Sequence, residues 1–511
     1  MLCSAVSSCA TYLGTASLTF AQLRGACLQH QPVSLLPFAA GYYLSYLFRS
    51  INALIAGDLT AELGLSAADL GLLTSLYFLV FAAAMLPFGV LLDRYGPRVV
   101  DSALLLVAAA GSLVFATADG IWSLILGRAL IGLGVTVGLI AGLKAIVMWF
   151  PPERVALANG WYIMLGALGA LSATGPAEVV VHSVGWRGLF AIVAVASAAV
   201  ALLILLVVPE KEPAQPAGCS PKVGFSTVFR DTRFWRIAPL SATGAGTSWS
   251  LQGLWAAPWL TDVAGLDRSA VVEHLTLMAA VLSATAVLLG ALAERLRRAG
   301  ISTEIFLAGT LALSMAAQLT LLLGVPVSSH LLFATIAVAG ASTVLSFAIL
   351  ARYFPKEVAV RANAALGVLN MGTAFGLQCL GGFVIARWPA AEGHYPADTH
   401  QAAMAAGLIL QLISLAVFFT PKRRMKPAPM AHAVVRALSF NASAPATVRP
   451  VYFSWTHQVE FARRQRAAWR LAAAASAALC LGLAATLSIT VSRPAVALHV
   501  IQLSRPPSAS N

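Results

Sequence analysis

The sequence predicts an all-α protein that crosses a membrane many times and consists of two similar halves. Of its 511 residues, 59% are hydrophobic and only 10% are charged, whereas soluble domains average about 45–50% and about 25%. Apolar runs of about 20 residues, the length of a helix that spans a bilayer, recur along most of the chain. Two motifs also occur twice with nearly the same spacing. The composition therefore indicates a membrane protein, and the paired motifs indicate an internal duplication.

Twelve apolar runs are long enough to span a bilayer, six in each half of the chain. They lie near residues 33–57, 69–92, 99–118, 122–148, 159–182, 188–208, 237–261, 271–293, 303–325, 331–352, 362–386 and 401–420. They define an N-terminal extension (1–32), a first six-helix bundle (33–208), a cytoplasmic linker (209–236), a second six-helix bundle (237–420) and a basic tail (421–511).

The segments outside the two bundles are predicted from local composition. Prolines, charges and small residues cluster at 209–221, where no core can form, so this stretch is the predicted linker. In the tail, the Ala-rich run 472–491 follows a group of arginines and is interpreted as either a thirteenth span or a surface helix. The N-terminal extension lacks the basic region and cleavage site of a signal peptide, so none is predicted.

Basic residues predict which helix ends face the cytoplasm. They concentrate in alternate connections, at Arg94, Arg98, Arg154, 211–236, Arg295, Arg352 and 422–426. The positive-inside rule makes these connections cytoplasmic, so both ends of the twelve-span core are expected inside, in a bacterial inner membrane. This distribution explains the net charge of +13 without a nucleic-acid partner. The lipid bilayer is the expected partner, and the protein is expected to be a monomer.

Cysteine and histidine usage argues against an enzyme. The six cysteines have no paired spacing, which predicts neither a disulfide framework nor a zinc site. The nine histidines include none at a metal-like spacing, and no nucleotide-binding motif lies in a soluble segment. We therefore expect no cofactor, no metal and no enzymatic activity.

Two repeated motifs are the evidence for the internal duplication. Gly89-Val-Leu-Leu-Asp93-Arg94-Tyr-Gly96-Pro-Arg98 ends one apolar run, and Gly290-Ala-Leu-Ala-Glu294-Arg295 ends another, at an offset of 201 residues (290 − 89). Phe150-Pro151-Pro-Glu153 returns as Phe354-Pro355-Lys-Glu357, at an offset of 204 residues (357 − 153). Duplicated halves of a membrane protein are typical of secondary transporters. Gly89 would let a neighbouring helix come close, and Asp93 would accept hydrogen bonds from the N-terminus of a facing helix.

The first motif resembles the G-x-L-x-D-R-x-G-R-R signature of the major facilitator superfamily. The matching residues are Gly89, Leu91, Asp93, Arg94, Gly96 and Arg98, whereas Pro97 replaces a basic residue. The resemblance implies two six-helix bundles related by a pseudo-two-fold axis, which rock about a central substrate site. In the family the acid helps hold the cytoplasmic side shut. This implies gating roles for Gly89, Asp93, Arg94, Gly96 and Arg98, and for their echoes Glu294 and Arg295.

A second match lies in the fourth run, where Gly127-Arg128-Ala-Leu-Ile-Gly132-Leu-Gly134 resembles the family's R-x-x-x-G-x-G element. Arg128 near the outer end of this helix either couples transport to protons or conformation, or extends to the outer headgroups. The glycines of the fifth run do not follow the strict order that resembles proton-driven drug antiporters, which weakens drug export as a function without excluding it.

Arg49 is the main candidate for substrate binding. Arginine in the middle of a span costs about 2.5–3.5 kcal/mol on insertion scales, so it marks a functional position. On one helix, Tyr42, Ser45, Tyr46, Arg49 and Asn52 share an arc of about 120°, which predicts a polar stripe facing the interior. The alternative is an arginine paired with a structural acid or extended toward Asp58.

This stretch resembles the first helix of the organophosphate and phosphate antiporter branch, where an arginine in a matching context contacts the anion. That branch uses a second arginine in the seventh helix, but the region from Trp249 to Trp259 has no basic residue. A singly charged carboxylate therefore fits better than a phosphate. Gln252 and Trp255 are predicted to line the cavity, whereas Trp259 is assigned to an interfacial belt.

Four further polar residues complete the predicted site. Lys144 either adds positive charge to the cavity or extends to the cytoplasmic interface, and Asn370 and Gln378 are either cavity amides or links between helices. Glu178 is the best-placed carboxylate for a coupling proton, with an ordinary interfacial acid as the alternative.

The sequence thus predicts a secondary active transporter that moves a small, carboxylate-like organic anion, with a proton as the symported ion. Alternatives are an exchanger, a proton-driven drug or sugar transporter, and a non-transporting membrane sensor or scaffold that uses residues 421–511 as a contact module.

Overall fold

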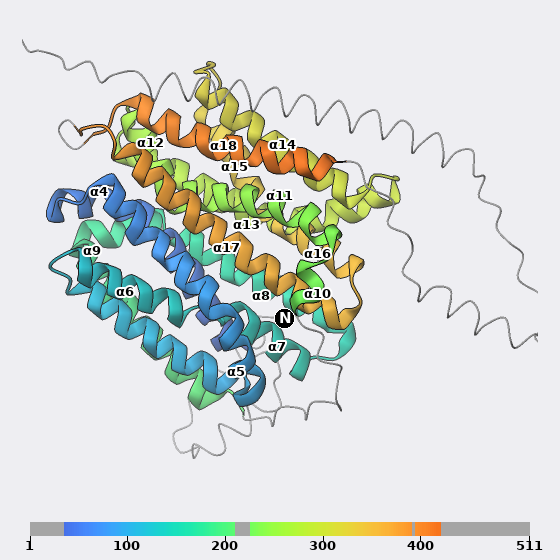
Figure 1. Ribbon diagram of the computed structural model, residues 1–511. Coiled ribbons are helices and arrows are strands. Elements are labelled where there is room, and N and C mark those ends of the chain that lie inside the picture. Colours follow the sequence, from blue (N-terminus) through green and yellow to red (C-terminus); the bar gives the residue numbers. More distant parts are fainter. Residues whose placement is uncertain (1–34, 210–224, 391–393, 421–511) are drawn as a thin grey trace, which may run out of the picture.

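The computed structural model describes residues 35–209, 225–390 and 394–420. The predicted N-terminal extension, most of the predicted linker and the basic tail with its apolar run at 472–491 lie outside these residues. Within them, the chain forms helices joined by short connections (Figure 1).

The first half contains the first six predicted runs. Its helices are α3 (Leu36–Ser50), α4 (Asn52–Leu63), α5 (Ala67–Ala116), α6 (Ile121–Gly134), α7 (Gly138–Trp149), α8 (Pro152–Ser172) and α9 (Gly175–Val207). α5 begins with a capping box, in which the Ser66 side chain accepts from the Asp69 N–H and the Asp69 carboxylate accepts from the Ser66 N–H. Two predicted runs fall on α5 because the chain reverses within it at Gly96, where φ is 79°. Only glycine adopts such a φ easily.

The second half contains the other six runs. Its helices are α10 (Phe225–Phe229), α11 (Thr232–Ser250), the π-helix η2 (Leu251–Trp255), α12 (Ala256–Asp262), α13 (Arg268–Arg298), α14 (Thr303–Leu322), α15 (Ser329–Ala341), α16 (Thr343–Tyr353), α17 (Lys356–Ile385) and α18 (Ala397–Phe419). Its first long helix, α11, begins at Thr232 rather than near residue 237, because the Asp231 side chain caps it by accepting the Arg233 N–H.

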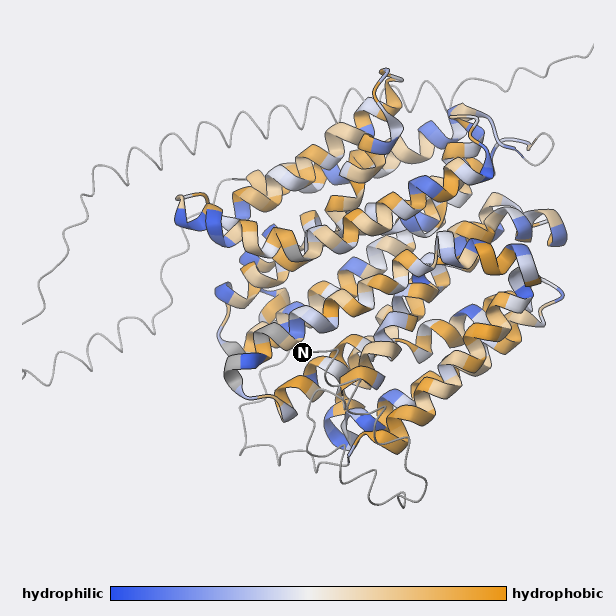
Figure 2. Cartoon of the chain, turned by 180° about the vertical axis from the view of Figure 1, so that it is seen from behind, coloured by the Kyte–Doolittle hydropathy of each residue, from blue (hydrophilic) through white to orange (hydrophobic). Residues whose placement is uncertain are grey.

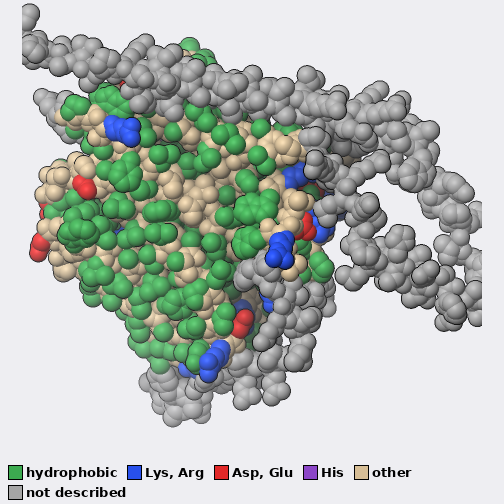
Figure 3. All heavy atoms as spheres, in the orientation of Figure 1, with side chains coloured by type: hydrophobic (Ala, Val, Ile, Leu, Met, Phe, Trp, Pro, Cys, Tyr) green, Lys and Arg blue, Asp and Glu red, His purple; other side chains and the backbone are tan. Residues whose placement is uncertain are grey.

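The protein is an integral, multi-pass membrane protein. Eight helical stretches among the described residues are long and apolar enough to cross a bilayer. Hydrophilic residues gather toward the helix ends and turns, and the middle stretches are mostly hydrophobic (Figure 2). The side of the molecule in Figure 3 is likewise largely hydrophobic, with most basic and acidic side chains near its edges. Such a surface suits contact with lipid chains rather than water.

The two halves lie side by side, with the blue-to-teal helices in one group and the green-to-orange helices in the other (Figure 1). They meet where α5 packs on α17, α8 on α13, and α3 and α4 on η2. One end of the bundle, called here the Gly96 face, holds the turns at Gly96, Pro151, Gly300 and Pro355. The opposite end, the Gly185 face, holds the turns at Gly64, Gly120, Gly185, Gly265 and Gly324.

The halves are in close contact at the Gly185 face. A Cβ atom on Gly382 of α17 would lie 2.6 Å from the Ala67 carbonyl oxygen and 3.1 Å from the Gly71 Cα, so two helices touch through their backbones. In addition, Arg268 of the second half binds carboxylates of the first half. This face is therefore closed.

The first glycine of the motif, toward the Gly96 face, is not packed against another described helix. Beside Gly89 of α5 there is open space, with no atom within 4 Å of an added Cβ. The prediction that Gly89 allows close approach of a neighbouring helix is wrong for this conformation, because no described residue packs against it.

Candidate substrate cavity between the halves

A cavity of about 250 Å³ lies between the two halves. Its polar lining includes Tyr42, Ser45, Tyr46, Arg49, Tyr77, Trp249 and Asn370, from α3, α5, α11 and α17. Its wall continues through Met85, Leu143 and Phe347 toward the Gly96 face. Among the described residues, Arg49 is the one charged side chain in this lining. The cavity therefore offers a single positive charge inside a mostly apolar and aromatic wall.

Arg49 lies where the sequence predicts, on the interior face of α3. It is 8% exposed, and its guanidinium carbon lies 4.0 Å from the Tyr46 ring centroid and 5.1 Å from that of Trp249. Neither an ion pair nor a hydrogen bond of this guanidinium occurs among the described residues, and Nη2 is buried without a partner. Both alternatives for Arg49, a structural acid partner and extension toward Asp58, are therefore wrong, because Asp58 binds Arg268 instead.

Tyrosines form the wall next to Arg49. The rings of Tyr42 and Tyr162 are stacked with centroids 5.2 Å apart, and Tyr46 meets Tyr42 edge-on at 5.1 Å. Glycines make room for these rings, since a Cβ on Gly166 would lie 2.2 Å from the Tyr42 ring and one on Gly142 would lie 2.0 Å from Tyr162. These close contacts fix the rings, so the wall is preformed.

Arg128 of α6 is fully buried beside the same cavity. It is 0% exposed, its guanidinium carbon lies 4.9 Å from the centroid of the cavity residue Tyr77, and none of its guanidinium nitrogens has a hydrogen-bond partner among the described residues. Extension to the outer headgroups is therefore wrong. The glycines after Arg128 pack α6 tightly on α5, since a Cβ on Gly134 would lie 2.4 Å from the Ala108 nitrogen. This packing keeps the guanidinium inside.

Four residues predicted to bind substrate do not line this cavity; one of them, Lys144, is described below with the motif residues. Asn52 is buried and donates from Nδ2 to the Thr74 hydroxyl at 3.2 Å. Gln252 and Trp255 lie on η2, where the Trp255 indole N–H donates to the Gln378 carbonyl at 3.0 Å. The extra residue in each π-helical turn rotates side chains away from their α-helical positions, and the closed Gly185 face packs these residues between the halves.

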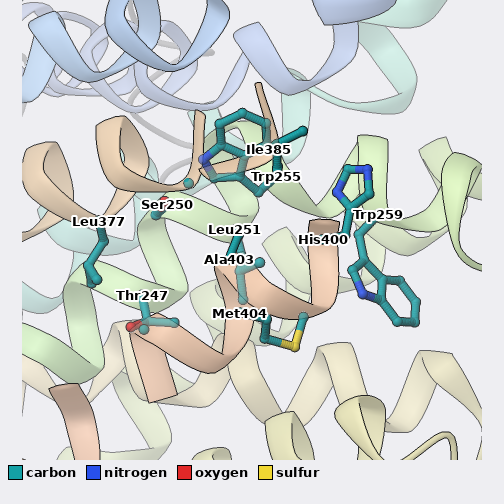
Figure 4. A pocket seen from close by; sticks show the side chains of 12 residues that line it. Thr247, Ser250, Leu251, Trp255, Trp259, Leu377, Ile385, His400, Ala403 and Met404 are labelled. Carbon is teal, nitrogen blue, oxygen red and sulfur yellow. The ribbon is translucent and has the colours of Figure 1, made fainter. Parts of the chain in front are cut away.

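Trp255 and Trp259 line a separate, small cavity of about 50 Å³ (Figure 4). Trp259 is only 7% exposed and packs against Phe333 with ring centroids 5.4 Å apart. Its assignment to an interfacial belt is therefore wrong, because the second half covers it.

The amides of α17 differ in position. Asn370 lines the central cavity as predicted, and both polar atoms of its buried side chain lack a partner among the described residues. Gln378 is also fully buried with an unpartnered side-chain amide, but it does not line that cavity. Asn370 is therefore the amide available to a solute beside Arg49.

The motif residues form contacts within one half. Lys144 donates to the Asp93 carboxylate at 2.8 Å and to the Leu92 carbonyl, and does not line the cavity. Its prediction as a substrate-binding residue is wrong for this conformation, because the motif acid holds it. The Asp93 side chain is 80% exposed and binds Lys144 of its own half, so the expected bond to a facing helix is absent among the described residues. Arg98 donates to the Leu205 carbonyl at 2.5 Å.

The remaining motif residues lie at the Gly96 face. Arg94 is exposed and lies over the Tyr95 ring, with 5.2 Å to the centroid. Glu294 binds Arg297 and Arg298 of its own helix, and these hydrogen bonds lower the pKa of Glu294 to about 2. Arg295 beside it is exposed. The second copy of the motif therefore stabilises the end of α13 in this conformation and does not link the halves.

Comparison with known proteins identifies the family. The profile of the Major Facilitator Superfamily matches residues 38–344. The chain belongs to the major facilitator superfamily. The predicted family and the predicted fold of two helical bundles are therefore confirmed.

Several relatives are similar in sequence to part of this chain. It is 36% identical over 129 residues to the nitrate/nitrite transporter NrtP of Picosynechococcus sp., covering 25% of this chain and 24% of that protein. It is 26% identical over 212 residues to the nitrite extrusion protein of Bacillus subtilis, covering 41% and 52%. It is 29% identical over 163 residues to a probable L-galactonate transporter of Escherichia coli, covering 32% and 36%. These matches span from about a quarter to half of the relatives' lengths.

Solved structures of the superfamily share the fold over most of the described chain. A bacterial homologue of the human lysosomal transporter Spinster, in an inward-facing and occupied conformation, aligns with a TM-score of 0.63 and 21% identity, covering 77% of this chain and 98% of that one.

Glu178 is the residue predicted to bind a coupling proton. It forms an ion pair that links the two halves. Arg268 of α13 binds Glu178 of α9 at 2.6 Å and Asp58 of α4 at 2.9 Å. Glu178 is therefore neither a free proton acceptor nor an unpaired interfacial acid in this conformation.

Two further sets of titratable residues were missed by sequence reasoning. Asp101 of α5 is 1% exposed, and its Oδ2 has no partner among the described residues. An acidic residue inside the predicted membrane span 99–118 could have marked Asp101 as a functional candidate. Asp262, His394 and His400 gather at the Gly185 face, and no sequence spacing pointed to them because they come from distant connections.

Proposed function

We propose that the protein carries a small organic monocarboxylate by alternating access around Arg49. The observation that carries the proposal is the pair of buried guanidinium groups, Arg49 and Arg128, with no acid partner among the described residues. Tyr77 lies beside Arg128 and lines the cavity with Arg49. A buried cation without a counter-ion is costly, and a bound anion would offset that cost.

The cavity favours an organic anion of one charge. Arg49 alone contributes charge to its described lining, which suits a single carboxylate better than a dianion. At about 250 Å³, the cavity is much larger than an inorganic ion such as nitrate. The tyrosines and Trp249 would pack against the carbon skeleton, and Asn370 would bind a hydroxyl or carbonyl group of the solute. The names of the three relatives, which concern nitrate, nitrite and L-galactonate, support an anion.

The test is thermal stabilisation of the purified protein by a panel of solutes. Monocarboxylates such as sugar acids are expected to raise the melting temperature in proportion to the logarithm of their concentration. Nitrate, phosphate esters, neutral sugars and cationic drugs serve as the comparison. Stabilisation by a sugar or a drug, without any by carboxylates, would replace this proposal with sugar or drug transport.

Orientation and energy coupling complete the proposal. The Gly96 face is assigned to the cytoplasm of a bacterial inner membrane, because the basic residues concentrate in its connections. Symported protons are the proposed driving force, with Asp101 as the coupling carboxylate inside the bilayer. A Cβ on Gly41 would lie 3.6 Å from Asp101 Oδ2, so this carboxyl contacts the helix that carries Tyr42 and Arg49. A change in its charge would act directly on that helix.

Asp101→Asn is expected to remove proton-driven accumulation while leaving solute exchange intact. The amide keeps the shape but carries no titratable proton, so an inward proton gradient would no longer raise uptake into proteoliposomes, whereas counterflow of labelled solute would continue. Asp119→Asn, in an exposed connection, is the matched control and is expected to behave like the original protein. Accumulation that still follows the proton gradient in Asp101→Asn would exclude Asp101 as the coupling residue.

A further inference from the structure

Two histidines share one carboxylate at the Gly185 face. Asp262, the last residue of α12, accepts from His394 Nδ1 at 2.7 Å and from His400 Nε2 at 2.8 Å. The side chains of Asp262 and His400 are 6% and 2% exposed, whereas that of His394 is 66% exposed. His400 also lines the small cavity beside Trp259 (Figure 4). The three side chains connect the end of α12 to the start of α18 and to the connection before it.

The same carboxylate holds a contact between the two halves. Asp262 Oδ2 also accepts from the backbone N–H of Tyr395, at 3.2 Å. The Tyr395 hydroxyl oxygen in turn accepts from the N–H of Ala67, at 3.1 Å, in the first turn of α5. Ala67 is the residue whose carbonyl lies against Gly382 at the closest approach of the halves. The Asp262 cluster therefore positions the tyrosine that attaches the second half to the first.

Most other charged groups around the cluster are already paired with other residues. A vestibule of about 500 Å³ at this face is lined by Asp262, His394, His400 and Arg268. Arg268 is bound to Asp58 and Glu178, and Asp267 caps α13. Asp398, in the first turn of α18, is exposed and makes no hydrogen bond or ion pair with the described residues. The histidines are therefore the groups that face Asp262 directly.

Asp262 remains an anion throughout the neutral range. Its partial burial acts to raise the pKa, but the hydrogen bonds from His400, His394 and the Tyr395 N–H outweigh this and hold the pKa of Asp262 below its ordinary value. Histidine is the side chain that ordinarily changes charge between about pH 5 and 8. A change of pH in that interval would therefore act on the imidazoles, opposite a carboxylate that stays charged.

We infer that His394 and His400 form a proton-binding site at the Gly185 face and that their charged forms hold this face closed through Tyr395. Each neutral ring already donates one N–H to Asp262, and the proton binds at the other ring nitrogen. The resulting imidazolium is bound more strongly by the carboxylate, because charge-assisted hydrogen bonds are shorter and stronger. His394, which is exposed, is the first acceptor.

The inference rests on the proposed proton symport and gives its direction a structural basis. A proton arriving from the Gly185 face would stabilise closure of that face, so a loaded carrier would then open toward the Gly96 face. Loss of the proton would loosen Tyr395 and let the Gly185 face open again. This ordering is what symport from the Gly185 face requires.

The test is a distance measurement across the Gly185 face as a function of pH. Spin labels at Thr117→Cys and Val327→Cys, on exposed turns of the two halves, report its width in a full-length protein whose natural cysteines are replaced by serine. In nanodiscs without solute, the ratio of short to long distances is expected to rise on the order of tenfold between pH 8 and pH 5.5. A ratio that is independent of pH would overturn the inference.

Variants separate the proposed site from other titrating groups. His394→Gln with His400→Gln is expected to abolish the pH response, whereas His182→Gln, an exposed histidine of α9 near the same face, is expected to retain it. Tyr395→Phe removes the acceptor for Ala67 and is expected to favour the long distance at both pH values. A pH response that survives the double histidine substitution would be assigned to another group, such as His274 and His330, whose ring centroids lie 3.7 Å apart.

This measurement can fail or succeed independently of the anion assignment. Because no solute is present, a histidine-dependent pH response with no carboxylate binding would keep the proton site and reject the proposed solute. Carboxylate binding without that response would keep the solute and reject the proton site.

Discussion

Arg49→Ala is expected to abolish carboxylate binding and uptake while leaving the amount of folded protein in the membrane unchanged. Arg49 is the charged side chain of the described cavity lining, and no described acid is paired with it that its removal would leave unpaired. Loss of one member of a buried ion pair costs about 3–5 kcal/mol, so the affinity for the solute should fall by roughly 100-fold or more. The measurement is the solute-induced shift in melting temperature, together with uptake into proteoliposomes.

Two control variants make this result specific. Arg387→Ala removes an exposed arginine at the Gly185 face and should leave binding unchanged, which excludes a general effect of net charge. Arg49→Lys keeps the charge but loses the planar contact with Tyr46 and Trp249, so an intermediate affinity is expected. If Arg49→Ala binds carboxylates as tightly as the original protein, Arg49 has a structural role and the solute site lies elsewhere.

Gly382→Val is expected to force open the Gly185 face. A Cβ at this position would lie 2.6 Å from the Ala67 carbonyl oxygen and 3.1 Å from the Gly71 Cα, and backbone atoms cannot move aside locally. Overpacking of this kind costs typically about 1–3 kcal/mol. Because the clash exists only in the closed state, the ratio of closed to open protein should fall by roughly 5- to 150-fold. The distance between labels at positions 117 and 327 measures this ratio.

A glycine on the same helix provides the control. Gly376→Val, also on α17, places its side chain in open space, so the distance distribution should stay as in the original protein. Gly382→Ala should give a smaller shift than valine, because it adds only the Cβ. An unchanged distribution in a folded Gly382→Val protein would mean that closure does not depend on this backbone contact.

Part of the candidate site was predictable because it depends on a single helix. Tyr42, Tyr46 and Arg49 lie on one face of α3, and the helical period places them together without reference to the rest of the fold. The prediction fails three residues later, at Asn52, which bonds to Thr74 instead. It also fails for Gln252 and Trp255, because an ideal α-helical period was assumed where the chain forms a π-helix.

The partners of the charged residues were not predictable for a different reason. Lys144 binds Asp93, Glu178 binds Arg268, and neither pairing follows from spacing in the chain. The Arg268 bridge and the Asp93 contact also belong to one conformation. A transporter exchanges such contacts as it opens and closes. A sequence motif therefore indicates which residues form the contacts, but not in which conformation they form.

The sequence by itself determined that this chain is a helical membrane protein of two duplicated halves with an arginine in the first span. These features follow from composition, run length and repeated motifs, which act locally along the chain. Only the tertiary structure decided that Arg128 and Asp101 are buried without ionic partners among the described residues, that Trp259 is covered, and that Asp262 joins His394 to His400. Burial and pairing of these side chains depend on which helices pack together and on which face of the bundle is closed.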